Sequence, residues 1–119
     1  MVAKTLCINL FTTPYTFQNT QTAMRLARAA LARGYRVKVF AYGDGVHNFT
    51  SGQRPRGVPN PEEGFTALAR EGLQVELCGT CLNFRGLGEA ALMEEAAPSS
   101  MKNLCEIIRT SEVFVTLAF

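Results

Sequence analysis

The stretch Leu6-Cys7-Ile8-Asn9-Leu10-Phe11 begins the strand–helix–strand unit that decides the fold. Its nearly continuous apolar character predicts a first strand over residues 4–11 that is buried on both faces. Apolar residues then recur at helical spacing from Ala23 to Leu31, with Thr20 as the predicted cap and Gly34 as the predicted end. Residues 35–42 predict a second strand. A unit of this length forms a right-handed crossover, so the sheet is expected to begin parallel.

The remainder of the chain continues to alternate between helix and strand signals. Residues 43–60 form a long irregular stretch with four glycines and two prolines, and loops of this length are usually functional or mobile. The run Asn60-Pro61-Glu62-Glu63 predicts a helix start, and that helix is expected to extend to Gly72. Residues 73–78 predict a third strand.

The C-terminal part predicts two helices and a last strand. Residues 89–97 are expected to be helical until Pro98, after which Ser99 or Ser100 caps another helix. That helix should bury one face, made of Met101, Leu104, Cys105 and Ile108. Residues 113–119 predict the closing strand. The pattern predicts one domain over residues 1–119, a three-layer α/β/α sandwich with a mostly parallel sheet of four to five strands.

Composition limits the class of protein. An apolar fraction of 47% and a charged fraction of 18% indicate a globular chain. No apolar run approaches the roughly 20 residues of a membrane span, and the N-terminus does not resemble a signal peptide. We therefore expect a cytoplasmic protein with reduced cysteines and no membrane partner. The basic residues are not interleaved with aromatic residues in a patch, so no direct nucleic-acid partner is predicted.

The topology predicts where a site would lie. The loops after the first three strands, over residues 12–19, 43–60 and 78–86, share the carboxyl edge of a parallel sheet, where sites collect. This edge should bring together several side chains that can carry chemistry: Tyr15, Asp44, His47, Asn48 and the loop that begins at Cys78.

Cys78 and Cys81 are the predicted catalytic residues. Two thiols three residues apart, where a strand gives way to a loop, should be exposed enough to react. The backbone N–H groups that follow, and Arg85, would favour a thiolate at Cys78. Cys81 is interpreted either as a thiol that resolves a disulfide or persulfide on Cys78, or as a mere neighbour. Small half-buried apolar residues are the structural alternative for both, and Cys7 and Cys105 are predicted to be core residues of that kind.

The residues around the thiols offer supporting roles. His47 could serve as a base or proton donor near Cys78 or could be an ordinary polar loop residue. Asp44 and its flanking glycines more naturally shape a turn than bind phosphate, and no nucleotide-binding pattern follows the first strand. One C-x-x-C pair supplies only two of the four ligands of a structural zinc site. No cofactor or metal is predicted.

The chain resembles the DsrE/TusD-type subunits of bacterial sulfur relays, the DsrE/F-like family. The segment Phe40-Ala41-Tyr42-Gly43-Asp44-Gly45-Val46-His47-Asn48 and the spacing from Cys78 to Arg85-Gly86 carry the resemblance, which covers essentially the whole chain. It implies an α/β/α fold, a persulfide on Cys78 that is handed to a partner's cysteine, and trimers stacked into hexamers of one chain or of related chains. The chain differs at Cys81, where relay subunits commonly have a small apolar residue.

The leading hypothesis is an intracellular sulfur carrier, a persulfide sulfurtransferase that accepts sulfur on Cys78 from a donor protein and passes it to an acceptor protein. Two alternatives remain. The Cys78–Cys81 pair could be a C-x-x-C thiol–disulfide redox site, or the fold could serve as a non-catalytic oligomeric binding module in which the cysteines are incidental.

Overall fold

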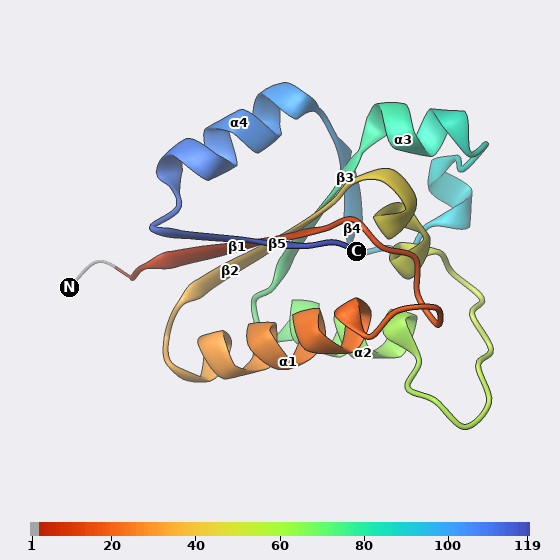
Figure 1. Ribbon diagram of the computed structural model, residues 1–119, viewed down its shortest axis with the longest axis horizontal. Helices are drawn as coiled ribbons and strands as arrows, with labels where there is room; N and C mark the ends of the chain where they lie inside the picture. Colours follow the sequence, from red (N-terminus) through yellow and green to blue (C-terminus); the bar gives the residue numbers. More distant parts are fainter. Residues whose placement is uncertain (1–2) are drawn as a thin grey trace.

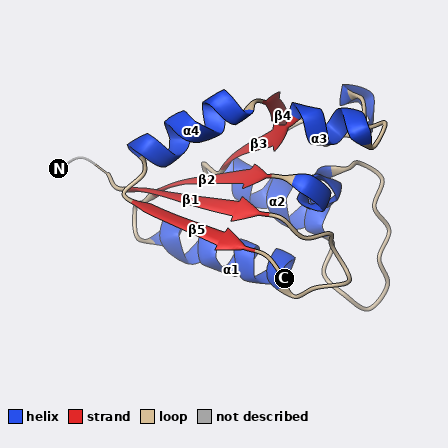
Figure 2. Cartoon of the chain, turned by 45° about the horizontal axis from the view of Figure 1, so that its top comes forward, coloured by secondary structure: helices blue, strands red, loops and turns tan. Residues whose placement is uncertain are grey.

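The computed structural model describes residues 3–119. Its centre is a five-stranded sheet made of β1 (Thr5–Leu10), β2 (Arg36–Ala41), β3 (Gln74–Cys78), β4 (Ala96–Ser99) and β5 (Val113–Leu117). The strand order is β4-β3-β2-β1-β5, and every neighbouring pair is parallel. The strands therefore all end at one edge, on the right of Figure 2, where the connecting loops gather.

Helices cover both faces of this sheet. In Figure 1, α1 (Asn19–Ala32) and α2 (Pro61–Arg70) lie below the sheet, and α4 (Met101–Thr110) and α3 (Gly79–Phe84) lie above it. The predicted three-layer α/β/α sandwich is confirmed. No helix within residues 3–119 combines the length and apolar character needed to cross a membrane.

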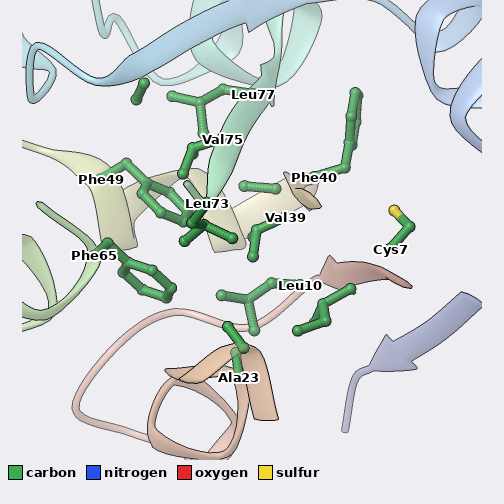
Figure 3. Close-up of a cluster of buried hydrophobic side chains, with 14 of the residues drawn as sticks. Cys7, Leu10, Ala23, Val39, Phe40, Phe49, Phe65, Leu73, Val75 and Leu77 are labelled. Atoms are coloured by element: carbon green, nitrogen blue, oxygen red, sulfur yellow. The ribbon is translucent and has the colours of Figure 1, made fainter. Parts of the chain in front are cut away.

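The hydrophobic core lies mainly between the sheet and the α1–α2 layer. Side chains alternate between the two faces of each strand, and Leu10 of β1 and Val39 of β2 point towards Ala23 of α1 (Figure 3). Phe49 and Phe65 stack in a tilted pair at 4.6 Å between ring centroids and close the same core. Burial of such aromatic and aliphatic surface is the dominant stabilising contribution.

Most helices start at the capping residues that the sequence predicts. The Asn60 side chain accepts hydrogen bonds from the N–H groups of Glu62 and Glu63 at the start of α2, and Ser100 accepts one from Asn103 at the start of α4. Thr20 does not cap α1, which starts one residue before it. Its hydroxyl instead donates to the buried Asn48 side chain, so a tertiary partner takes the place of the local one.

The helix predicted for residues 89–97 is wrong. Only Glu89–Ala91 forms a single 3-10 turn, and Ala96–Ser99 forms β4 instead. Backbone pairing with β3, from Val75 opposite Ala96 to Cys78 opposite Ser99, outweighs the helix propensity of the alanines and glutamates. Pro98 is tolerated because β4 is an edge strand.

Cys7 is a core residue as predicted, with no exposed surface, but the same prediction for Cys105 is wrong. Helix α4 buries Leu104 and Ile107, whereas Met101, Cys105 and Ile108 remain exposed. The buried stripe is thus narrower than the predicted one. One helix lying on a flat sheet buries only the residues that face it directly.

Candidate functional site

Of the two predicted catalytic cysteines, Cys78 is the last residue of β3 (Gln74–Cys78), and Cys81 lies in the first turn of α3. The expected loop over residues 78–86 is wrong in detail, because β3 ends at Cys78 and α3 begins at Gly79 without an intervening loop. Cys78 occupies the N-cap position, and its Sγ accepts the backbone N–H of Cys81 at 3.5 Å. A single turn of helix therefore sets the spacing between the two thiols.

The expectation of an exposed thiol at Cys78 is also wrong. Cys78 retains 2% of its surface and Cys81 retains 8%. The cause is the unpredicted strand β4, whose last residue, Ser99, pairs with Cys78. A Cβ on Gly79 would lie 3.0 Å from the Ser99 carbonyl oxygen, so the start of α3 lies close against β4. The pair sits at the predicted edge of the sheet, with Cys81 as its more accessible member.

The loop after β2 contributes a direct contact to Cys81. The backbone N–H of Gly43 donates to Cys81 Sγ at 3.2 Å, from a turn in which Gly43 adopts φ +59°. This left-handed conformation favours glycine. The sequence predicts a turn at Gly43 but not the hydrogen bond from its N–H to the Cys81 thiol. The available signal was its position at the end of the strand next to β3.

Burial raises the pKa of the Cys81 thiol, and a hydrogen bond with the Cys78 side chain raises it further. The Gly43 N–H and the positive charge of Arg85 act in the opposite direction, because both favour the thiolate. Cys81 is thus a partly shielded thiol beside two groups that stabilise its ionised form.

Asp44 and Arg85 form an ion pair beside Cys81. The Arg85 guanidinium donates to Asp44 Oδ1 through Nη2 at 2.7 Å and through Nε at 2.9 Å. Its remaining nitrogen, Nη1, donates to the Cys81 carbonyl oxygen at 3.0 Å. Arg85 therefore links the end of α3 to the 3-10 helix η1 (Gly43–Phe49). Two of the four predicted supporting residues, Asp44 and Arg85, thus lie beside the Cys81 segment.

The other residues predicted at this edge have different surroundings. Asn48 is fully buried and donates to the Thr12 and Gly45 carbonyl oxygens, so it ties η1 to the loop after β1. His47 is half-buried, and its carbonyl oxygen accepts from Thr50. Tyr15 donates to Gln53 on the exposed side of the 50–60 loop. Asp44 and Arg85, in contrast, hydrogen-bond to each other, and Arg85 also hydrogen-bonds to the Cys81 backbone.

The described residues do not provide a set of metal ligands at this edge of the sheet. Within residues 3–119, no group of three His, Cys, Asp or Glu side chains lies close enough together to hold an ion.

Comparison with known proteins shows which family the chain belongs to. The sequence profile of the DsrE/DsrF-like family matches residues 4–117. An uncharacterised protein of Methanopyrus kandleri is 35% identical over 99 residues, covering 83% of this chain and 82% of that protein. An uncharacterised protein of Methanocaldococcus jannaschii is 34% identical over 103 residues, covering 87% and 90%.

Solved structures show the same fold. The YchN protein of E. coli superposes with a TM-score of 0.90 at 22% identity, over 96% of this chain and 99% of that protein. The protein MTH1491 of Methanobacterium thermoautotrophicum superposes with a TM-score of 0.81 at 14% identity, over 96% and 99%. The chain belongs to the DsrE/DsrF-like family.

Proposed function

We propose that this chain is a sulfur carrier, a persulfide sulfurtransferase whose working group is the Cys78–Cys81 dithiol. The observation that carries the proposal is the contact between Gly43 N–H and Cys81 Sγ at 3.2 Å, beside a Cys78 Sγ that lies 3.5 Å from Cys81 N. Thiolates accept sulfane sulfur by the same substitution at sulfur that occurs in thiol–disulfide exchange. Membership of the DsrE/DsrF-like family supports a role related to sulfur relays.

The relay needs a donor and an acceptor protein, and the surface beside the thiols suits such a partner. Phe84, at the end of α3, is 82% exposed and directly precedes Arg85 in the sequence. An exposed aromatic residue next to a charged pair is typical of a docking contact. Donor and acceptor thiols would approach the Cys78–Cys81 pair beside this surface.

We also propose that the protein assembles, as a homo-oligomer of three or six chains or as a mixed hexamer with related subunits. Support comes from the exposed apolar residues of α4 and of the edge strand β5, which include Ile108, Val113 and Phe114. Exposed apolar surface next to an unpaired strand edge favours association.

The test of sulfur uptake uses chains in which the exposed Cys105 is replaced by serine, so that it does not take up sulfur itself. The reduced Cys105→Ser protein is mixed with glutathione persulfide, quenched with an alkylating reagent and weighed by intact mass spectrometry. We expect the dithiol to be modified, either with an added sulfur or as a disulfide. The Cys78→Ser/Cys81→Ser/Cys105→Ser protein is the matched control and should stay unchanged. A Cys105→Ser protein that remains reduced and free of added sulfur refutes the proposal.

A thiol–disulfide redox function is the second candidate, and the C-x-x-C spacing favours it, with Cys78 at the N-cap of α3 and its Sγ accepting the Cys81 N–H. Glutathione disulfide in place of the persulfide separates the two functions. A sulfur carrier reacts much faster with the persulfide. A redox protein is oxidised by the disulfide at a comparable rate and takes up no sulfur.

A further inference from the structure

The basic side chains of the N-terminal half of the chain are not neutralised by acidic neighbours. Residues 1–60 carry eight Lys and Arg residues and a single acid, Asp44. That carboxylate is bound to Arg85 of the C-terminal half. Within residues 3–119 the ion pairs are those of Arg85 and Arg109, so the basic side chains of residues 3–60 form none. Part of this unpaired charge gathers along one groove in the surface.

The groove runs between the start of α1 and the loop over residues 50–60, at the lower right of Figure 1. It consists of three hollows of about 140, 250 and 350 Å³. The first hollow shares Pro59 with the second and Tyr15 with the third, so the three adjoin one another. We call this surface the arginine groove, because exposed arginines line its second and third hollows: Arg25 and Arg28 of α1, and Arg54 and Arg56 of the loop.

The arginine groove combines positive charge with apolar surface. None of the residues that line its three hollows is acidic. Glu62, at the start of α2, lies outside this lining, and its carboxylate already accepts the Gln53 N–H at 3.1 Å. Val58, which is 50% exposed, lines the hollows together with Pro55 and Pro59. Guanidinium groups bind carboxylates through paired hydrogen bonds, and apolar hollows accept aliphatic side chains.

One wall of the arginine groove is held in place before any ligand binds. Tyr15 adopts φ +74°, in the left-handed region that favours glycine, and its hydroxyl donates to Gln53. Gln53 in turn donates to the carbonyl oxygens of Asn48 and Thr50. These bonds hold the loop over residues 50–60 against the loop after β1. A ligand therefore does not have to order this wall first, which lowers the cost of binding.

We propose that the arginine groove binds an extended acidic segment of a partner protein. The carboxylates of the segment contact the arginines, and its apolar side chains occupy the hollows between them. Charge complementarity of this kind gives fast and specific association. Binding at the groove does not involve Cys78 or Cys81, so it stands or fails separately from sulfur uptake.

The lining favours a peptide over a single-stranded nucleic acid. A nucleic-acid track requires free aromatic rings on which successive bases stack. Phe17 is already stacked on Phe119, with 5.9 Å between the ring centroids, which leaves Tyr15 as the free ring of the lining. A second copy of the chain is not the expected occupant either. The surface proposed for assembly includes α4, which covers the opposite face of the sheet from α1 (Figure 1).

Fluorescence anisotropy with a model peptide tests the arginine groove. The probe is a fluorescein-labelled peptide in which Glu-Leu-Glu is repeated four times, titrated with the full chain at 50 and 300 mM NaCl. We expect saturable binding that weakens at the higher salt concentration, because the contacts are ionic. Arg54→Gln/Arg56→Gln should raise Kd at least tenfold. The matched control, Arg33→Gln/Arg36→Gln, removes the same charge at the amino edge of the sheet and should raise Kd less than threefold.

Further measurements separate the arginine groove from other basic surfaces. A probe with serine in place of leucine should bind at least fivefold more weakly, and equal binding of the two peptides would overturn a role for the hollows. Tighter binding of a labelled twelve-nucleotide oligouridylate, lost in Arg54→Gln/Arg56→Gln, would assign the groove to nucleic acid instead. Smaller species of that variant in sedimentation velocity would make the groove a contact between copies.

Two results of the peptide titration overturn the proposal outright. One is the absence of binding to the wild-type chain at 50 mM NaCl. The other is an equal loss of binding in Arg54→Gln/Arg56→Gln and in the control variant, which would show that only net charge matters. Circular dichroism and urea unfolding check that both variants keep the fold, as expected for substitutions of exposed side chains.

Discussion

Arg85 holds Asp44 with two hydrogen bonds, at 2.7 and 2.9 Å, while its third nitrogen reaches the carbonyl oxygen of Cys81 at 3.0 Å. A single side chain thus joins the loop after β2 to the short helix that carries the second thiol. The same loop supplies the Gly43 N–H that contacts Cys81 Sγ. The position of the dithiol therefore depends on two neighbouring strands and not on α3 alone.

Replacing Arg85 by glutamine should reduce the reactivity of Cys81. The Arg85 charge lowers the pKa of that thiol, so its loss raises the pKa and leaves less thiolate at neutral pH. We expect alkylation of Cys81 at pH 7.5 to be slower by about two- to fivefold, because the site is partly screened by solvent. The free energy of unfolding should change by less than about 1 kcal/mol, as for other exposed pairs.

This rate is measured in the Cys78→Ser/Cys105→Ser background, where Cys81 is the accessible thiol. Arg109→Gln is the matched control, since Arg109 forms a comparable ion pair with Glu106 within α4. Equal effects of the two substitutions would contradict an electrostatic role for Arg85 at the site.

Replacing Gly45 by alanine should disrupt the fold around the site. A Cβ at this position would lie 2.0 Å from the Leu10 carbonyl oxygen, and a backbone atom of β1 cannot move aside. We expect a loss of about 1–3 kcal/mol in the free energy of unfolding, as for other overpacked positions. Gly88→Ala is the control, because its Cβ meets nothing within 4 Å. Urea unfolding of the two variants should differ clearly, and similar midpoints would contradict the close packing of η1 on β1.

The fold was largely predictable because its signals are local or periodic. The strands at Leu6 and Val37 and the helix start at Asn60 follow from apolar runs and a cap. The strand at Ala96 was not predictable, because its alanines favour a helix and only pairing with β3 makes them extended. That missing strand also explains the error in the exposure of Cys78, since Ser99 of β4 pairs with it.

The candidate site was predictable in its residues but not in its contacts. The parallel topology brought Asp44 and Arg85 towards the thiols, as the ends of neighbouring strands must converge. The Gly43 N–H contact was not predictable, because almost every residue has a backbone N–H and the sequence does not show which of them donates to a thiol. Asn48 donates buried hydrogen bonds to the Thr12 and Gly45 carbonyl oxygens, and its burial could not be derived from a polar side chain in an irregular stretch.

Cys7 should make the protein less stable in alkali. Burial raises the pKa of this thiol from 9.0 to about 12, an effect that Lys38 opposes and Glu76 strengthens. Above pH 9 the unfolded chain ionises this thiol while the folded chain does not, so ionisation favours unfolding. The contribution of the neutral thiol is complete below pH 9 and is lost as the pH rises towards 12.

The comparison is between wild type and Cys7→Ala in urea at pH 8 to 10.5, under reducing conditions. Relative to the variant, the wild type should lose up to about 1.4 kcal/mol per pH unit above pH 9. A constant difference between the two proteins over this range would show that Cys7 ionises equally in both states.

Assembly should depend on the apolar surface of α4 and β5. We expect sedimentation velocity to show a trimer or a hexamer. Ile108→Lys or Phe114→Lys should raise the dissociation constant of the assembly by more than tenfold and so shift the protein towards smaller species. Val58→Lys is the control, since Val58 is another exposed apolar residue and lies in the loop over residues 50–60. A wild-type monomer, or equal effects of the control, would contradict an interface on this surface.

The most direct test of the central claim is the amount of sulfane sulfur that the dithiol withdraws from a donor. Glutathione persulfide is incubated with excess reduced Cys105→Ser protein, and the sulfane sulfur left in the small-molecule fraction is measured by cyanolysis. We predict the loss of close to one sulfur for each chain that reacts, and no loss beyond the protein-free sample for Cys78→Ser/Cys81→Ser/Cys105→Ser. Equal consumption by the two proteins would contradict a sulfur-handling role for Cys78 and Cys81.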